Sequence, residues 1–294
     1  MFSLYNELAN FEYKHRAYTF FQVFDNKKRN IFKADVRDRI IHQIIYDHLV
    51  MLYEPIFISD SYSSRNRKGH HKAIQMLRYF IKLATDGGHV PCFVLKCDIK
   101  KYFDNVDHTV LLECISEKVT CTDTMSVITE IISSFNSTAV SPGGSVKGRG
   151  IPLGNITSQI FANIYLHRLD MFIKKELQCR WYVRYNDDIA IVANNLEKLE
   201  ILRDTLIRFV AEELRLNIPM EKTSIRKVQW GIDFLGYVIL PSAVLLRDQT
   251  KHKMYSGISR KNVDSYLGML KHCNSHNLKQ KVIAKVDEFN VDDI

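Results

Sequence analysis

The 294-residue sequence lacks several features that would place it in common protein classes. Its six cysteines form no CxxC pair, and no Cys/His cluster has zinc-finger spacing, so neither a zinc site nor a disulfide framework is expected. The sequence has no run of about 18 apolar residues, no apolar stretch behind a basic N-terminus, no internal repeat and no low-complexity linker. We therefore expect a cytoplasmic protein with no membrane span and with reduced, mostly buried thiols.

Acidic charge is also in the minority, because 41 Lys and Arg residues outnumber 33 Asp and Glu residues and give a net charge of +8. The positive charge is concentrated in two places. Six Lys or Arg residues and no acid lie between Arg65 and Lys82. Nine Lys or Arg residues and two acids lie between Arg247 and Lys285. Two separate basic segments favour a polyanionic partner, held by its phosphate backbone or by a triphosphate.

Apolar periodicity predicts helices over much of the chain. The predicted helices cover residues 35–53, 72–83, 155–177 and 196–214, and the segment 109–135 is expected to be mainly helical. Asn155 or Thr157 is expected to cap the helix that runs to about Leu177. Ser141–Gly150, which contains four glycines and a proline, is expected to form a loop.

Strands are predicted where β-branched and aromatic residues gather. Phe93–Ile99 is predicted as a buried strand, Trp181–Ala193 as a tight hairpin, and Phe234–Leu246 as short strands around Gly236. The order of strand, helices, hairpin, helix and strands predicts an α+β fold with an antiparallel sheet.

Three acidic residues stand out in this arrangement. Asp98 lies at a strand end, and Asp187 and Asp188 lie at the tip of the predicted hairpin. Carboxylates gathered at one sheet edge repel one another unless a cation neutralises them, and hard oxygen ligands suit Mg²⁺. The alternative interpretation is a solvated acidic turn, since Asn-Asp is common turn chemistry. Apolar flanks and the recurrence of an acid at a second strand end favour the metal site.

Five blocks, in order from about Lys33 to Leu240, resemble the motifs of reverse transcriptases. Tyr185-Asn186-Asp187-Asp188 resembles the YxDD box, and Asp98, followed five residues later by Phe103, resembles the first catalytic motif. The remaining blocks resemble the fingers motif, the motif after the hairpin and the primer grip: Ser61-Tyr62 with Arg65 and Gly69, Leu216-Asn217 with Glu221-Lys222-Thr223, and Phe234-Leu235-Gly236-Tyr237.

A further block narrows the subfamily. Most relatives carry Gln-Gly, three residues and then Ser-Pro before the long helix, whereas here Leu153 replaces the glutamine and Gln159 the proline. This version resembles the reverse transcriptases of diversity-generating retroelements, as does Ser265–His272 in its thumb-like segment. The resemblance implies a right-hand polymerase, with fingers at residues 1–90 and part of 110–150, a palm at 91–240 and a short helical thumb at 241–294.

The resemblance also implies roles for the acidic residues and their neighbours. Two Mg²⁺ ions, with Mn²⁺ as an alternative, would be held by Asp98, Asp187 and the carbonyl of Ile99, with Asp188 in support. Phe103 would lie under the sugar and reject a 2′-hydroxyl, although a core aromatic is the rival interpretation. Lys222 would protonate the pyrophosphate leaving group, with an ordinary surface lysine as the rival.

Nucleotide and nucleic-acid contacts follow from the same resemblance. Arg65 and Lys68 would contact the triphosphate as charged donors, against the alternative of a solvated basic loop. The remaining implied dNTP contacts are Leu153, Gly154 and Tyr185. Gly154 would let the backbone approach the template–dNTP pair closely. The implied template–primer contacts are Phe234, Leu235, Gly236, Tyr237 and Lys271.

The implied function is RNA-directed synthesis of cDNA from a structured template RNA, error-prone at template adenines. The implied partners are the template RNA, the primer or cDNA, dNTPs and a small basic accessory protein, with no membrane. One alternative is another bacterial reverse transcriptase, of the antiphage-defence or group II intron type, and Leu153 and Gln159 argue against the intron type. A second is a catalytically silent nucleic-acid-binding scaffold, which would not need Asp98, Asp187 and Asp188.

Overall fold

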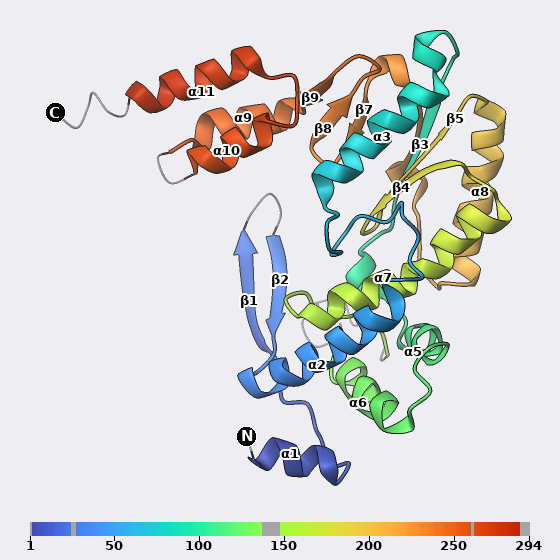
Figure 1. Ribbon diagram of the computed structural model, residues 1–294, viewed down its shortest axis with the longest axis vertical. Helices are drawn as coiled ribbons and strands as arrows, with labels where there is room; N and C mark the ends of the chain where they lie inside the picture. The colour runs from blue at the N-terminus through green and yellow to red at the C-terminus, as the bar shows by residue number, and fades with distance from the viewer. Residues whose placement is uncertain (1, 25–27, 137–147, 260–261, 289–294) are drawn as a thin grey trace.

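The computed structural model describes residues 2–24, 28–136, 148–259 and 262–288 (Figure 1). Of the expected loop Ser141–Gly150, only the last three residues fall within these ranges. Among the helices that the structure describes, none has the combination of length and apolar character that a membrane span requires.

The centre of the molecule is a four-stranded antiparallel sheet with the strand order β4-β5-β3-β6. Its strands are β3 (Phe93–Asp98), β4 (Trp181–Tyr185), β5 (Asp188–Ala193) and β6 (Thr223–Lys227). The first three confirm the predicted strand and hairpin. The sequence does not predict β6, because this edge strand, TSIRK, is polar and mostly exposed.

Alternate residues of each strand point to opposite faces of the sheet. In β3, Leu95 and Cys97 belong to the larger hydrophobic core, on what we call face A, whereas Val94 belongs to a second core, on face B. Asp98 has the same parity as Val94, and its direct cross-strand partner is Asp188. Both carboxylates therefore lie on face B, at the end of the sheet.

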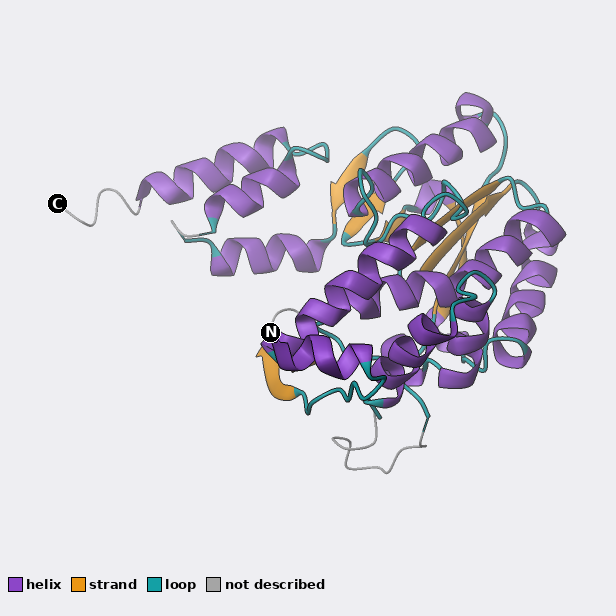
Figure 2. Ribbon diagram, turned by 60° about the horizontal axis from the view of Figure 1, so that its bottom comes forward, coloured by secondary structure: helices purple, strands orange, loops and turns teal. Residues whose placement is uncertain are grey.

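Face A is covered by helices, and Figure 2 shows the strands behind them. The central helix is α7 (Ile156–Met171), which continues as a π-helical turn to Glu176, as the predicted helix to about Leu177 required. The helices whose buried residues share this core, or that lie beside it, are α1 (Phe2–Ala9), α2 (Val36–Tyr53), α4 (Tyr102–Asn105), α5 (His108–Ser116), α6 (Thr122–Ser133) and α8 (Leu196–Glu212).

The start of α7 differs from the prediction. Asn155 occupies the N-cap position, but its side chain makes no capping hydrogen bond. Its amide instead donates to the carbonyl of Phe32 at 2.7 Å, and its Oδ1 accepts from the backbone N–H of Ala34 at 3.0 Å. Thr157 does not cap the helix either, since its hydroxyl contacts His42 at 2.5 Å. Tertiary partners outcompete the local capping bonds at both residues.

Face B is covered by α3 (His70–Ala84) and by a small antiparallel sheet. The strands of the small sheet are β7 (Ile232–Phe234), β8 (Tyr237–Ile239) and β9 (Val244–Leu246), as the sequence predicts around Gly236. Three helices follow, α9 (Asp248–Gly257), α10 (Val263–Leu270) and α11 (His276–Glu288), and they lie to one side of the central sheet in Figures 1 and 2.

Strand pairing and helix packing link residues on the two sides of the expected domain boundaries. The boundary at residue 240 falls inside a hairpin, because β9 pairs with β8 and extends the small sheet to Leu246. Helix α3, expected in the fingers, packs on the strands β4 and β5 of the central sheet. The N-terminal hairpin of β1 (Thr19–Phe24) and β2 (Lys28–Lys33) projects toward the three C-terminal helices in Figure 1.

Candidate active site

Three carboxylates meet at one end of the central sheet. Asp98 ends β3 and Asp188 begins β5, and the two residues are paired directly across the strands. Asp187 lies beside them in the two-residue turn, where Asn186 adopts a left-handed φ of 50°. Asn tolerates this conformation better than most residues, so the turn sequence suits the tight hairpin. The prediction that these acids come together is confirmed.

The electrostatic environment of the turn penalises negative charge. Burial, followed by the neighbouring Asp188 and Asp98 carboxylates, raises the pKa of Asp187 to about 6. Burial also raises the pKa of Asp188, although the Lys96 ammonium opposes this shift. Lys222 places its Nζ 2.6 Å from Asp98 Oδ1. The cluster thus holds more carboxylate than its lysines compensate, which is the environment that a bound cation relieves.

The donor set therefore fits a divalent cation of the Mg²⁺ type, which takes oxygen ligands. Within the described ranges, no group of three His, Cys, Asp or Glu side chains already has the geometry of a metal site. Lys222 gives one reason, because its ammonium holds Asp98 by an ion pair. Ile99, whose carbonyl is the expected fourth ligand, follows Asp98 directly and has a buried side chain.

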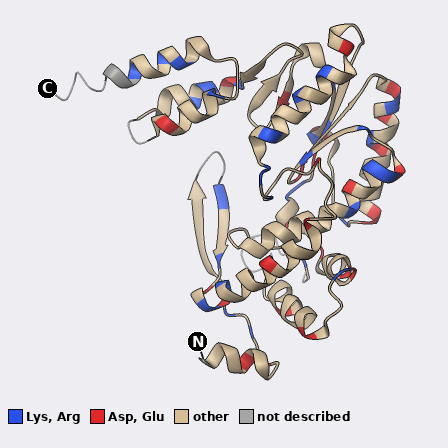
Figure 3. Ribbon diagram, in the orientation of Figure 1, with Lys and Arg blue, Asp and Glu red and all other residues tan. Residues whose placement is uncertain are grey.

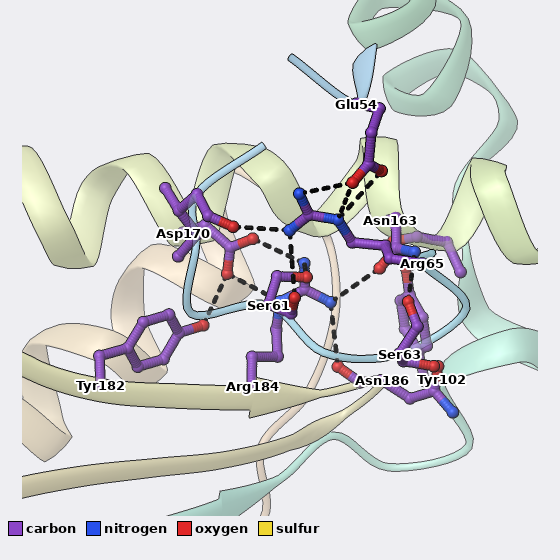
Figure 4. Close-up of polar contacts among 12 residues, drawn as sticks. Glu54, Ser61, Ser63, Arg65, Tyr102, Asn163, Asp170, Tyr182, Arg184 and Asn186 are labelled. Carbon is purple, nitrogen blue, oxygen red and sulfur yellow. Dashed lines mark hydrogen bonds and ion pairs between the residues drawn. The ribbon is translucent and has the colours of Figure 1, made fainter. Parts of the chain in front are cut away.

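A buried polar network holds the hairpin from the opposite face (Figure 4). Arg184, on β4, is completely buried and points to face A, where it forms a bidentate ion pair with Asp170 of α7 at 2.6 and 2.7 Å. Tyr182 donates to the same Asp170 carboxylate at 2.7 Å. The Arg184 guanidinium also donates to the Ser61 hydroxyl at 3.0 Å and to the carbonyl of Asn186 at 3.3 Å.

The turn residue Asn186 has a second set of contacts in this network. The Ser63 hydroxyl donates to the Asn186 side chain, and Asn163 of α7 donates to the carbonyl of Ser63 at 2.9 Å. Segment 60–62 runs beside β4, since Tyr62 N–H donates to the Arg184 carbonyl and Arg184 N–H to the Asp60 carbonyl, both at 2.9 Å. The backbone next to Asp187 is thereby fixed to α7 and to the loop before α3.

Arg65, an expected triphosphate contact, is held within the chain. Its side chain is 6% exposed, and its guanidinium forms an ion pair with Glu54 at 2.9 Å. It also donates to the carbonyls of Ile58 and Ser61, at 2.6 and 3.1 Å. These contacts engage the guanidinium inside the chain and anchor the loop before α3. Lys68 lies nearby, and its Nζ donates to the Ser59 carbonyl at 2.6 Å.

Leu153 and Gly154 lie against the N-terminal hairpin. The carbonyl of Leu153 accepts from Phe32 N–H at 2.8 Å. Gly154 has a φ of +114°, and a Cβ there would lie 2.7 Å from the Ile31 side chain. The backbone conformation and this close packing within the chain both favour glycine at this position.

The expected primer-grip residues lie in the small sheet. Phe234 and Tyr237 are paired across β7 and β8 and are buried in the second core. Leu235 and Gly236 form the turn between them, both with positive φ, as in tight hairpin turns. Lys271 is exposed just after α10.

Two aromatic residues of the expected nucleotide site are half-buried. Phe103 follows Tyr102 in α4, and the two rings meet edge to face with centroids 5.4 Å apart. Tyr185 ends β4 directly opposite Asp188, and its ring meets His70 edge to face at 6.5 Å. Phe103 lies five residues after Asp98, and Tyr185 lies two residues before Asp187.

Sequence reasoning missed the residues of the buried network and one lysine of face B. Arg184 interrupts an apolar strand and Asp170 interrupts the apolar stripe of α7. A charge at a core position is itself a signal, because it must find an opposite charge in the fold. Lys96, two residues before Asp98, shares its face by the alternation of the strand. It donates to the carbonyl of Asp233 at 2.8 Å.

Comparisons with known proteins agree with this geometry. Residues 22–239 match the family model described as Reverse transcriptase (RNA-dependent DNA polymerase). Protein YkfC of Escherichia coli K12 is 25% identical over 253 residues, covering 74% of this chain and 64% of YkfC. The group II intron-encoded protein LtrA of Lactococcus lactis is 26% identical over 195 residues, covering 62% of this chain and 31% of LtrA. This chain thus spans less than two thirds of these relatives.

Solved structures show the same fold. Telomerase from Candida tropicalis, in complex with a fragment of telomeric RNA, matches with a TM-score of 0.56 and 14% sequence identity. The match covers 88% of this chain and 49% of the telomerase chain. The fold is that of a right-hand polymerase, as expected. Because the family model spans most of the sequence and includes all three carboxylates, the chain belongs to the reverse transcriptase family.

Proposed function

We propose that this protein is an RNA-directed DNA polymerase, which extends a primer 3′-hydroxyl with dNTPs along a template RNA. The observation that carries the proposal is the group of Asp98, Asp187 and Asp188 at one end of the central sheet, in a chain of this family. The raised pKa of Asp187 shows that keeping these carboxylates together costs free energy. A protein that only binds nucleic acid has no use for such a cluster, whereas an active site does.

The residues of the site have distinct proposed roles. Asp98, Asp187 and the Ile99 carbonyl would hold two Mg²⁺ ions, with Asp188 in support. When bound, these ions would activate the primer hydroxyl and stabilise the pyrophosphate. Lys222, already beside Asp98, would deliver a proton to the leaving group. The protein then acts mainly by positioning its substrates, as is general for phosphoryl transfer.

A primer-extension assay tests the proposal. The full chain is incubated with an RNA template, an annealed DNA primer, dNTPs and Mg²⁺, with Mn²⁺ in a parallel reaction. We expect incorporation of dNTPs that depends on the template and on the divalent ion. No incorporation on any template with either ion would favour a silent scaffold.

The finer proposal is a reverse transcriptase of a diversity-generating retroelement, which works with a small basic accessory protein. It is supported by Leu153 and Gln159, which depart from the pattern of most relatives, including the intron type. Two near-identical repeats that differ mainly at adenines, beside a small basic reading frame, would be the expected neighbouring DNA.

Replacing Phe103 with alanine should admit ribonucleotides. Phe103 is half-buried just after the Asp98 strand, where its ring would block a 2′-hydroxyl. The measurement is the ratio of kcat/KM for dNTP and rNTP. Phe209→Ala, which removes a half-buried ring stacked on Phe172 of the helical layer, is the matched control. Equal selectivity in Phe103→Ala and the unmodified protein would make Phe103 a packing residue only.

Replacing Leu153 with glutamine should lower misincorporation opposite template adenine. Leucine has no donor or acceptor, so it cannot penalise a misplaced pair by leaving a polar partner unsatisfied. One hydrogen bond of about 1 kcal/mol corresponds to a several-fold change in selectivity. Errors are counted separately opposite each template base, with Leu153→Met as the apolar control. If errors opposite adenine do not fall, the infidelity has another source.

A further inference from the structure

Two neighbouring hollows, of about 660 and about 320 Å³, lie along α3. Gln75 and Arg78 line both of them. The first is closed by Pro241 and Ser242, in the turn between β8 and β9. The second is closed by residues 271–274, just after α10. We call this feature the α3–thumb groove.

Charge in the α3–thumb groove has one sign. Arg78, Lys82 and Lys271 line it, and neither hollow is lined by an acidic residue. These three cations form no ion pair with any acidic side chain in the described parts of the chain. Helix α3 contains no acid, and in Figure 3 the charged segments of its ribbon are all blue. Unpaired cations around one groove attract a polyanion.

On the cationic side of α3, Arg78 donates to the carbonyl of Ser242 at 3.4 Å. Ala73, Ile74, Leu77 and Ile81 bury the opposite side of the helix in the second core. The outer side also presents Tyr79, which is 52% exposed and lines the same hollow as Arg78 and Lys82. An exposed aromatic ring beside two cations is the combination that holds a single strand, because a base stacks on the ring while phosphates meet the charges.

The groove leads away from the carboxylates. At its thumb end, His272 stacks on His71 of α3 at 3.6 Å, and His71 contacts the Tyr237 hydroxyl at 3.3 Å. At its far end, Asn194 donates to the carbonyls of Ala84 and Pro91, which ties the end of α3 to the start of β3. Asp98 lies at the other end of β3, roughly 16–20 Å away at about 3.3 Å per residue.

We propose that the α3–thumb groove binds a single-stranded stretch of the template RNA that lies outside the copied duplex. Phosphates would contact Arg78, Lys82 and Lys271, and a base would stack on Tyr79. The groove starts beside the primer-grip strand β8, so the strand that fits it continues from the template 3′ side of the duplex. This inference rests on the proposed function for the identity of the polymer.

The test compares the unmodified chain with Arg78→Ser/Lys82→Ser and with a matched control, Lys198→Ser/Arg208→Ser. The control removes two positive charges from exposed positions of α8, on the face A side. The probe is a short RNA–DNA template–primer, with or without an oligouridine tail on the template 3′ end. Binding is measured over a range of salt concentrations, and primer extension is measured on the probe without a tail.

We expect the tail to tighten binding to the unmodified chain and to the control. For the groove variant, the gain should disappear and the slope of log affinity against log salt should fall by about 1.4, about 0.7 for each lost phosphate contact on a single strand. Tyr79→Ala should weaken tail binding several-fold with an unchanged slope, because stacking involves no ion release.

Two results would overturn the inference. One is an unchanged tail effect and an unchanged salt slope in the groove variant. This result would indicate that the groove binds an acidic protein surface and not RNA. The other is an equal loss in the groove variant and the control, which would indicate non-specific attraction.

An oligothymidine tail distinguishes RNA from DNA, and equal binding of both would remove the assignment to RNA. Failure of the untailed probe to be extended would count against the proposed function and not against the groove.

Discussion

Replacing Asp187 with asparagine should abolish polymerisation while the protein remains folded and still binds RNA. Asparagine keeps the shape of the side chain and the turn, but it removes one of the two carboxylates proposed to hold both ions. The measurement is primer extension in Mg²⁺ and Mn²⁺, with RNA binding measured in parallel. Asp204→Asn, the same change at an exposed acid of α8, should extend primers normally.

The pKa of Asp187 also predicts the sign of the stability change in the Asp187→Asn variant. The pKa of Asp187 is raised by burial and by its acidic neighbours to about 6, above the value of 3.8 for an unperturbed carboxyl. A raised carboxyl pKa means that ionisation destabilises the fold, fully above about pH 6, and that this effect disappears as the pH falls toward 3.8. At pH 7 the Asp187→Asn protein should therefore unfold at an equal or higher denaturant concentration.

Divalent ions add a second readout that does not depend on activity. A ligand that binds only the folded state raises the midpoint of unfolding. Mg²⁺ should therefore stabilise the unmodified protein against thermal unfolding, and stabilise Asp187→Asn much less. Normal primer extension by a folded Asp187→Asn protein, or equal stabilisation of both proteins by Mg²⁺, would contradict the two-ion site.

Replacing Asp170 with alanine should destabilise the fold by about 3–5 kcal/mol, because it leaves the Arg184 guanidinium buried without a counter-charge. Arg184 is completely buried, and Tyr182 loses its acceptor in the same change. The measurement is denaturant unfolding. Arg203→Ala, which breaks an ion pair at the surface of α8, should cost at most about 1 kcal/mol.

A double variant separates stability from positioning. Asp170→Leu with Arg184→Met removes both charges, and apolar replacement of a buried pair often restores stability. We expect the double variant to be more stable than Asp170→Ala but to have a low kcat at saturating dNTP, because the Asn186 carbonyl and the Ser61 hydroxyl lose their donor. A kcat equal to that of the unmodified protein would assign the network to stability alone.

Much of the fold followed from local patterns in the sequence. The strand ending at Asp98, the hairpin around Asn186 and the helix from Asn155 were predicted because their periodicity and turn residues are properties of neighbouring positions. The three candidate catalytic acids were located for the same reason, since a strand end and a hairpin tip are readable without any tertiary partner. The polar edge strand β6 carried no such pattern.

The structure alone decided which side chains meet across long stretches of chain. Arg65 forms an ion pair with Glu54, and Arg184 forms one with Asp170. Asn155 binds the end of β2 instead of capping α7. Phe234 and Tyr237 are buried in the second core. The α3–thumb groove brings residues 75–82 beside residues 271–274. None of these pairings leaves a local signature, because a charge or ring at a given position looks the same whichever distant partner satisfies it. The sequence thus determined the elements and the acids, and the packing of those elements decided the partners.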